Sequence, residues 1–199
     1  DTGLDLDHPD IVDNLWVNED EIAENGIDDD GNGFIDDVYG WDFVDDDGDP
    51  APDTGEDSTP DAVTHGTVIA GIAGATGDNG IGINGVAWNV KLMSVRMLDA
   101  AGAGDSFTAS DAIDYAVANG ADVINLSFAG ELQDPLMRIA VRDAYRSGTV
   151  IVSALGNENQ NTDSNPVFPA CFSNAREDWV IGEGASTKSD DKSEFSNYG

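Results

Sequence analysis

The sequence has few of the residues that mark several common classes of protein. Its single cysteine, Cys171, allows no disulfide within the chain. Its only histidines, His8 and His65, lie far from that cysteine along the sequence, which argues against a zinc site. No apolar run approaches the roughly 20 residues that a membrane-spanning helix needs. A disulfide scaffold, a zinc-centred domain and a membrane span are therefore not expected.

Positive charge is also scarce. The 199 residues contain 8 lysines and arginines against 40 acidic residues, a net charge of −32. The first basic residue is Lys91, and 24 of the 40 acidic residues precede it. Nucleic acids and anionic lipids both require basic side chains, so neither is expected as a partner. Because the acidic residues are clustered, binding of divalent cations or a saline environment explains them better than a surface that is acidic only for solubility.

Residues 18–61 form an acidic insertion loop rich in glycine and proline. Beyond it we expect a helix that begins at His65 and further helices over 107–119 and from 135 to 147. A strand buried on both faces is expected over 89–98, a second buried strand over 121–128, and further strands over 149–155 and 179–186. Strands that alternate with helices predict right-handed crossovers and a parallel sheet, the α/β class. The helix over 107–119 would bury one side, made of Ala109, Ile113, Ala116 and Val117.

Three short segments carry residues suited to hydrolytic chemistry. Asp1-Thr2-Gly3 comes first, His65-Gly66-Thr67 follows, and SALGNEN covers residues 153–159. An Asp followed by a Gly-flanked His is the chain order of one kind of Ser-His-Asp hydrolase. Ser127 and Asn157 lie at or just beyond the carboxyl ends of predicted strands, where α/β sheets bind their ligands.

Taken together, seven ordered segments resemble the subtilisin-like serine proteases, the subtilase family. They run over essentially the whole chain and read DTGLDLDHPD, HGTVIAGIAGA, NGIGINGVA, VINLSFAG, IVSALGN, FPA and SNYG. The resemblance implies a serine endopeptidase with a three-layer fold, in which helices flank a central parallel sheet. It makes His65 the general base, Asp1 its orienting partner and Asn157 a donor to the oxyanion.

The resemblance also implies that residues 1–199 are a partial peptidase catalytic domain, truncated at both ends. The family's nucleophile motif, GTS, does not occur among them. The strand that precedes the family's catalytic Asp is expected before Asp1. We therefore expect these residues alone to be poorly stable and inactive as a peptidase.

The expected substrate is a peptide or protein that pairs as an added strand. The resemblance assigns its binding edges to five residues: Gly102, Gly104, Ser127, Phe128 and Ala129. Ala129 departs from the glycine usual in the family, so we expect a narrower pocket for the residue before the scissile bond.

The acidic half suggests calcium sites. Asp28-x-Asp30-x-Asn32-Gly33 begins like an EF-hand loop, to which the Phe34 carbonyl and Asp36 add oxygens. Tyr39 stands where an EF-hand has its bidentate Glu, and an ordinary solvated acidic loop is the alternative. Residues 45–49 could form a second, weaker site.

The resemblance implies a further calcium site. Its ligands would be Asp10, Asn79 and the carbonyls of Ile81 and Ile83. From the same resemblance we expect a secreted, extracellular monomer with Ca²⁺ as cofactor. Two alternatives remain: a non-catalytic calcium-binding module, and a pseudo-protease without the serine.

Overall fold

The α/β class predicted from the sequence is confirmed by a computed structural model that describes all residues from Asp1 to Gly199. Every strand pair in it is parallel. The chain divides into two compact units, Asp1–Thr108 and Ala109–Gly199, with the boundary inside helix α2 (Ser106–Ala118). None of its helices has the length and apolar character needed to cross a membrane.

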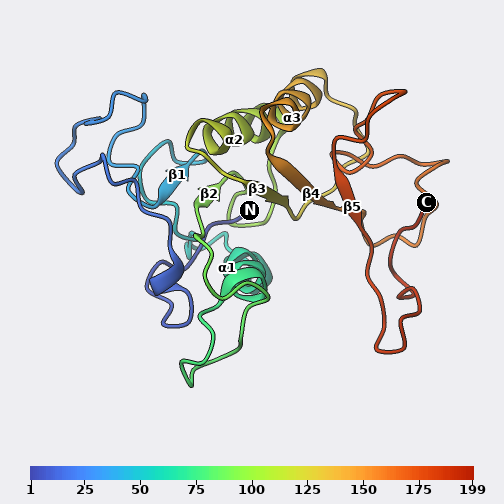
Figure 1. The fold of residues 1–199 in the computed structure, drawn as a ribbon, viewed down its shortest axis with the longest axis horizontal. Coiled ribbons are helices and arrows are strands. Elements are labelled where there is room, and N and C mark those ends of the chain that lie inside the picture. The colour runs from blue at the N-terminus through green and yellow to red at the C-terminus, as the bar shows by residue number, and fades with distance from the viewer. The chain divides into compact units, whose positions relative to one another are not determined.

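The first unit has little regular structure and long acidic loops (Figure 1). Its strands pair in parallel, with Asp42 opposite Arg96. The apolar segment predicted as a strand over 89–98 forms one only at its centre, and Leu92 makes an isolated bridge to Leu15. Its elements, in chain order, are η1 (Val12–Asn14), β1 (Gly40–Asp42), α1 (Pro60–Gly74) and β2 (Ser94–Arg96).

Helix α1 begins five residues before the predicted start at His65, so that prediction was wrong. Thr59 caps the helix, because its hydroxyl oxygen accepts the backbone N–H of Ala62 at 3.2 Å, and Pro60 is the first helical residue. Proline suits that position because the first N–H groups of a helix need no partner within it. His65 therefore lies in the second turn, held by helix on both sides.

The second unit is a three-stranded parallel sheet in the order β3-β4-β5, with helix α3 along one face (Figure 1). Asp134 caps α3 through the N–H groups of Leu136 and Met137, and Gly148 ends it with φ +99°. The helices end within one residue of the sequence prediction. Besides α2, the elements are β3 (Val123–Leu126), α3 (Pro135–Ser147), β4 (Val150–Ala154) and β5 (Ile181–Glu183).

The sequence predicts a buried strand over 121–128, but β3 and β4 are each buried mainly on one face. Ile124 and Ile151 are buried, whereas Val123 and Val150 on the other face are 58% and 43% exposed. The reason is that the helix packs against one face of this unit's sheet. On α2, the expected side is buried at Ala109, Ile113 and Ala116 and half-buried at Val117.

Candidate active site

Asp1 and His65, both predicted as site residues, are in direct contact within the first unit. Nδ1 of His65 lies 2.9 Å from Oδ1 and 3.0 Å from Oδ2 of Asp1. The Asp1 side chain is 17% exposed and that of His65 is 42% exposed. The carboxylate is thus largely shielded, while the ring keeps one edge open.

Thr2 and β2 fix the position of Asp1. The backbone N–H of Thr2 donates to Oδ1 of Asp1 at 2.6 Å, and the Thr2 hydroxyl donates to the Ala62 carbonyl of α1 at 2.7 Å. The Asp1 carbonyl accepts the N–H groups of Met97 and Leu98, which directly follow β2. The DTG segment is therefore tied both to a strand and to the helix that carries His65.

Gly66 allows α1 to approach that segment. A Cβ at position 66 would lie 2.1 Å from the carbonyl oxygen of Gly3 and 3.2 Å from Oδ1 of Asp1. Any side chain here would push the helix away from the Asp1 loop. The glycine after His65 is needed for close approach, and its signal was visible in the sequence as HGT.

The Asp1–His65 geometry selects one form of the imidazole. If Nδ1 carries a proton, it donates to the carboxylate, and Nε2 is left as an acceptor. A ring held in this way can accept a proton at Nε2, and the carboxylate stabilises the imidazolium that results.

The other residues predicted for the site are divided between the two units. Gly102 and Gly104 lie in the first unit, where the N–H of Gly102 donates to the Asp99 carbonyl at 2.9 Å. Ser127, Phe128 and Ala129 follow β3 in the second unit, and the Asn125 side chain donates to the Ser127 hydroxyl at 2.7 Å.

Asn157 lies in the second unit, three residues after β4. Its backbone N–H donates to Oε2 of Glu158 at 2.9 Å. Its side chain is exposed, and no protein group is bonded to its amide. The amide is therefore available to an outside acceptor.

The residues expected to bind calcium near the N-terminus do come together. Asp10 is 2% exposed, Asn79 Nδ2 donates to its Oδ1 at 2.9 Å, and the Ile83 N–H donates to its Oδ2 at 2.8 Å. Those two bonds hold the pKa of Asp10 below its ordinary value. The carbonyls of Ile81 and Ile83 accept no backbone hydrogen bond. A buried carboxylate with neutral oxygen donors beside it fits Ca²⁺.

In the acidic loop, Glu21 lies close to two of the predicted ligands, Asp28 and Asp30. Carboxylate oxygens of Glu21, Asp28 and Asp30 lie within 4.8 Å of one another. Glu21 was missed because nothing in the local pattern marks it. It is only 8% exposed, and its Oε1 accepts the N–H of Asp30.

The remaining predicted ligands of the loop make other contacts. The Asn32 side-chain oxygen accepts the Phe34 N–H at 2.7 Å, and its Nδ2 donates to Asp30. The Asp36 carboxylate accepts the N–H groups of Asn25 and Gly26, which places it on a neighbouring turn. The carboxylate oxygens gathered at Glu21, Asp28 and Asp30 have the chemistry that a hard cation prefers.

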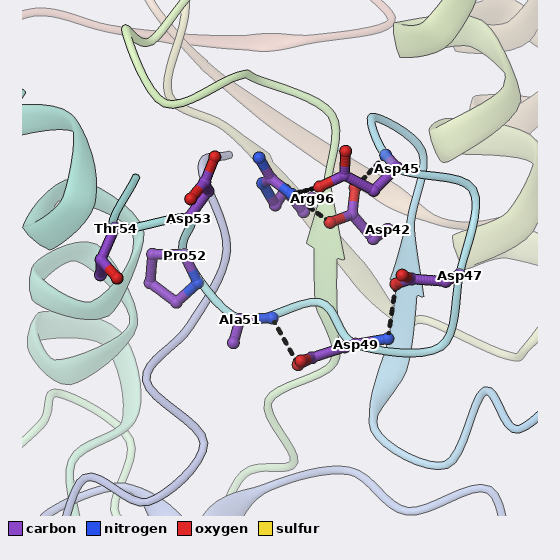
Figure 2. A pocket seen from close by; sticks show the side chains of 9 residues that line it. All are labelled: Asp42, Asp45, Asp47, Asp49, Ala51, Pro52, Asp53, Thr54 and Arg96. Carbon is purple, nitrogen blue, oxygen red and sulfur yellow. Dashed lines mark hydrogen bonds and ion pairs between the residues drawn. The ribbon is translucent and has the colours of Figure 1, made fainter. Parts of the chain in front are cut away.

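Of residues 45–49, the predicted second site, Asp45, Asp47 and Asp49 line part of an acidic cavity of about 260 Å³ (Figure 2). Arg96 is its one basic residue and is 3% exposed. Arg96 forms an ion pair with the buried carboxylate of Asp42, and its Nη1 also lies 2.7 Å from Oδ2 of Asp45. The lining consists of Asp42, Asp45, Asp47, Asp49, Ala51, Pro52, Asp53, Thr54 and Arg96.

The two buried charges of this cavity affect each other. Burial raises the pKa of the Asp42 carboxyl, although the hydrogen bond from Arg96 lowers it. Burial by itself would lower the pKa of Arg96, but its bonds to Asp45 and Asp42 outweigh that effect and raise it. Arg96 thus offsets part of the negative charge gathered there.

Comparison with known proteins agrees with the fold. The model of the subtilase family matches residues 1–199, and the chain belongs to that family. A solved structure of a cold-adapted subtilisin-like serine proteinase superposes with a TM-score of 0.71 at 28% identity, covering all of this chain and 57% of that one. The subtilisin-like fold predicted from the motifs is therefore confirmed.

Two curated relatives match over the full chain. The thermophilic serine proteinase of Bacillus sp. (strain AK1) is 37% identical over 199 residues, which make up 40% of that protein. Thermitase of Thermoactinomyces vulgaris is 34% identical over 199 residues, 57% of its length. The chain thus spans about half the length of these relatives.

Proposed function

We propose that the complete protein carrying these residues is a serine endopeptidase. The observation that carries the proposal is the contact of His65 Nδ1 with both carboxylate oxygens of Asp1. Membership of the subtilase family and the serine proteinases among its relatives support it. The nucleophile would be the serine of the family's GTS segment, which does not occur in residues 1–199.

In the proposed reaction, Nε2 of His65 takes the proton of the serine hydroxyl as its oxygen attacks the scissile carbonyl. The same proton then passes to the leaving amine, and Asp1 stabilises the intervening imidazolium. The Asn157 side chain would donate to the oxygen that becomes negative in the tetrahedral intermediate. The peptide would pair with the edges at residues 102–104 and 127–129.

Calcium is the proposed cofactor. Asp10, Asn79 and the carbonyls of Ile81 and Ile83 would hold one ion, and Glu21, Asp28 and Asp30 would hold another. The ion's chemical contribution is structural, because it neutralises carboxylates and ties residues 79–83 to Asp10. Secretion and a monomeric state belong to the same proposal.

A calcium-binding module without catalysis is the second candidate, favoured by the clustered carboxylates of the acidic loop. An assay of peptide cleavage distinguishes the endopeptidase from the calcium-binding module. The complete protein should hydrolyse a casein or peptide substrate and react covalently with a fluorophosphonate probe, which labels an activated serine.

His8 provides a matched control for this test. His65→Ala should abolish cleavage and labelling. His8→Asn should retain both, because an Asn oxygen can replace the His8 Nδ1 that accepts the Asp10 N–H. Calcium-dependent self-association with no cleavage by the wild-type protein would instead support the module.

A further inference from the structure

Asn197 joins residues 155–160, the loop that carries Asn157, through four side-chain hydrogen bonds. Its Oδ1 accepts the N–H of Glu158 at 3.1 Å and that of Gln160 at 2.8 Å. Its Nδ2 donates to the Leu155 carbonyl at 2.7 Å and to Oε2 of Glu158 at 2.8 Å. An asparagine side chain has two donors and two acceptor sites, so this amide uses its full capacity.

The contact is buried and specific. Asn197 is 2% exposed, and its own N–H donates to the Gly156 carbonyl at 3.1 Å. One residue therefore holds the loop on both sides of Asn157. A buried amide that lost these partners would leave several polar groups unsatisfied, which is costly.

Gly156 shows how closely the two segments fit. Its φ of +94° is one that side chains rarely adopt, and a Cβ there would lie 2.7 Å from both Asn197 Nδ2 and Glu158 Oε2. Glu158 is also shared, because the same Oε2 accepts the Asn157 backbone N–H. The backbone of Asn157 is thus fixed through Glu158 and Asn197, while its side chain has no partner in the protein.

We propose that Asn197 is a positioning residue that aims the Asn157 amide at the oxyanion. This inference rests on the proposed function, in which Asn157 is the donor. Asn197 itself contacts no substrate. It acts by holding the loop in the one conformation from which Asn157 points outward, so its effect on kcat requires Asn157.

Asn197→Asp is the sharpest variant, because it keeps the size and the acceptor oxygen. It replaces the Nδ2 donor with an oxygen that faces Glu158 Oε2 and the Leu155 carbonyl, and both contacts become repulsive. In the complete enzyme we expect kcat to fall about 10- to 100-fold with little change in KM, as misplacement of a catalytic donor does.

A double-mutant cycle tests the mechanism. Asn157→Ala should lower kcat about 100-fold or more. In that background, Asn197→Asp should change kcat less than about twofold, because the donor it positions is already absent. Asn197→Ser carries the same comparison if Asn197→Asp does not fold.

Asn174→Asp is the matched control, since Asn174 Nδ2 also donates to a glutamate Oε2, that of Glu177, at 2.7 Å. It should leave kcat near wild type. Two outcomes would overturn this inference while leaving the proposed function in place. One is that Asn197→Asp lowers kcat equally in the wild-type and Asn157→Ala backgrounds. The other is that Asn197→Asp does not lower kcat although Asn157→Ala does. A wild-type kcat in Asn157→Ala would instead overturn the oxyanion role within the proposed function.

Discussion

Gly66 of helix α1 packs against the backbone of Gly3, so closely that a Cβ on Gly66 would overlap the Gly3 carbonyl oxygen at 2.1 Å. This contact sets the distance between the helix that carries His65 and the loop that carries Asp1. The contact between Asp1 and His65 therefore depends on the absence of a side chain at Gly66 as well as on the two residues themselves.

Gly66→Ala should separate the two segments. The methyl group meets backbone atoms that cannot move aside independently, so we expect a loss of about 1–3 kcal/mol in the free energy of unfolding. Urea denaturation measures this. Gly71→Ala in the same helix is the control, because the nearest atom to its Cβ is 3.9 Å away. That variant should be neutral or up to about 1 kcal/mol more stable. Equal stability of the two variants would contradict the packing argument.

Removing calcium should lower the melting temperature of the protein. An ion present at about 100 times its Kd adds about 2.7 kcal/mol to stability, which EGTA would remove. Asp10→Asn should reduce the difference between melts with calcium and with EGTA, since it deletes the one carboxylate of that site and leaves the second proposed site intact. The exposed Asp57→Asn serves as the control. A melting temperature that EGTA leaves unchanged would count against both proposed sites.

Asp114→Asn should raise stability at neutral pH but not in acid. Burial raises the pKa of Asp114, and the charges of Asp111 and Asp143 raise it further. A carboxyl with a higher pKa in the folded than in the unfolded state disfavours folding once ionised. That cost is absent below the unfolded pKa and appears as pH rises through the folded value.

The expected gain is about 0.2–0.5 kcal/mol at pH 7.5, the size of a like-charge contact on a helix. Urea titrations of the variant and the wild type at pH 7.5 and at pH 3 would measure it. Asp163→Asn, an exposed site of the same unit, should show no such dependence on pH. A gain of equal size at both pH values would show that charge is not the cause.

Ala129→Gly should let the protein accept larger side chains at the substrate residue before the scissile bond. The methyl of Ala129 stands where the family usually has glycine, and removing it makes room for a larger side chain. A peptide series differing only at that residue should show a higher ratio of kcat/KM for Phe over Ala in the variant. An unchanged ratio would remove Ala129 from the specificity site.

Much of the second unit could be predicted from the sequence because its signals are local. Helix α3 is an example, because the residues that set its two ends lie at those ends. Asp134 and the proline after it begin the helix, and Gly148 ends it. The spacing of Ala109, Ile113 and Ala116 likewise marks the buried side of α2. Asp1 and His65 were found through short ordered motifs, although 64 positions separate them.

The features that were missed depend on contacts between distant segments. Glu21 joins Asp28 and Asp30 only because an irregular loop folds back on itself, and no periodicity records that path. The buried Arg96 sits in an apolar segment that reads as a plain strand, but its partner Asp42 comes from the acidic loop. The role of Asn197 depends in the same way on a loop 37–42 positions earlier.

The separation in sequence between Asn197 and residues 155–160 also affects the order in which this part of the chain folds. During synthesis, residues 155–160 are made before Asn197, the residue that holds them. We expect the Asn157 loop to sample several conformations until Asn197 arrives, because its partners in β4 and β5 do not supply those bonds. The chain would then fix the conformation of the Asn157 loop late, after most of this unit's strands and helices have formed.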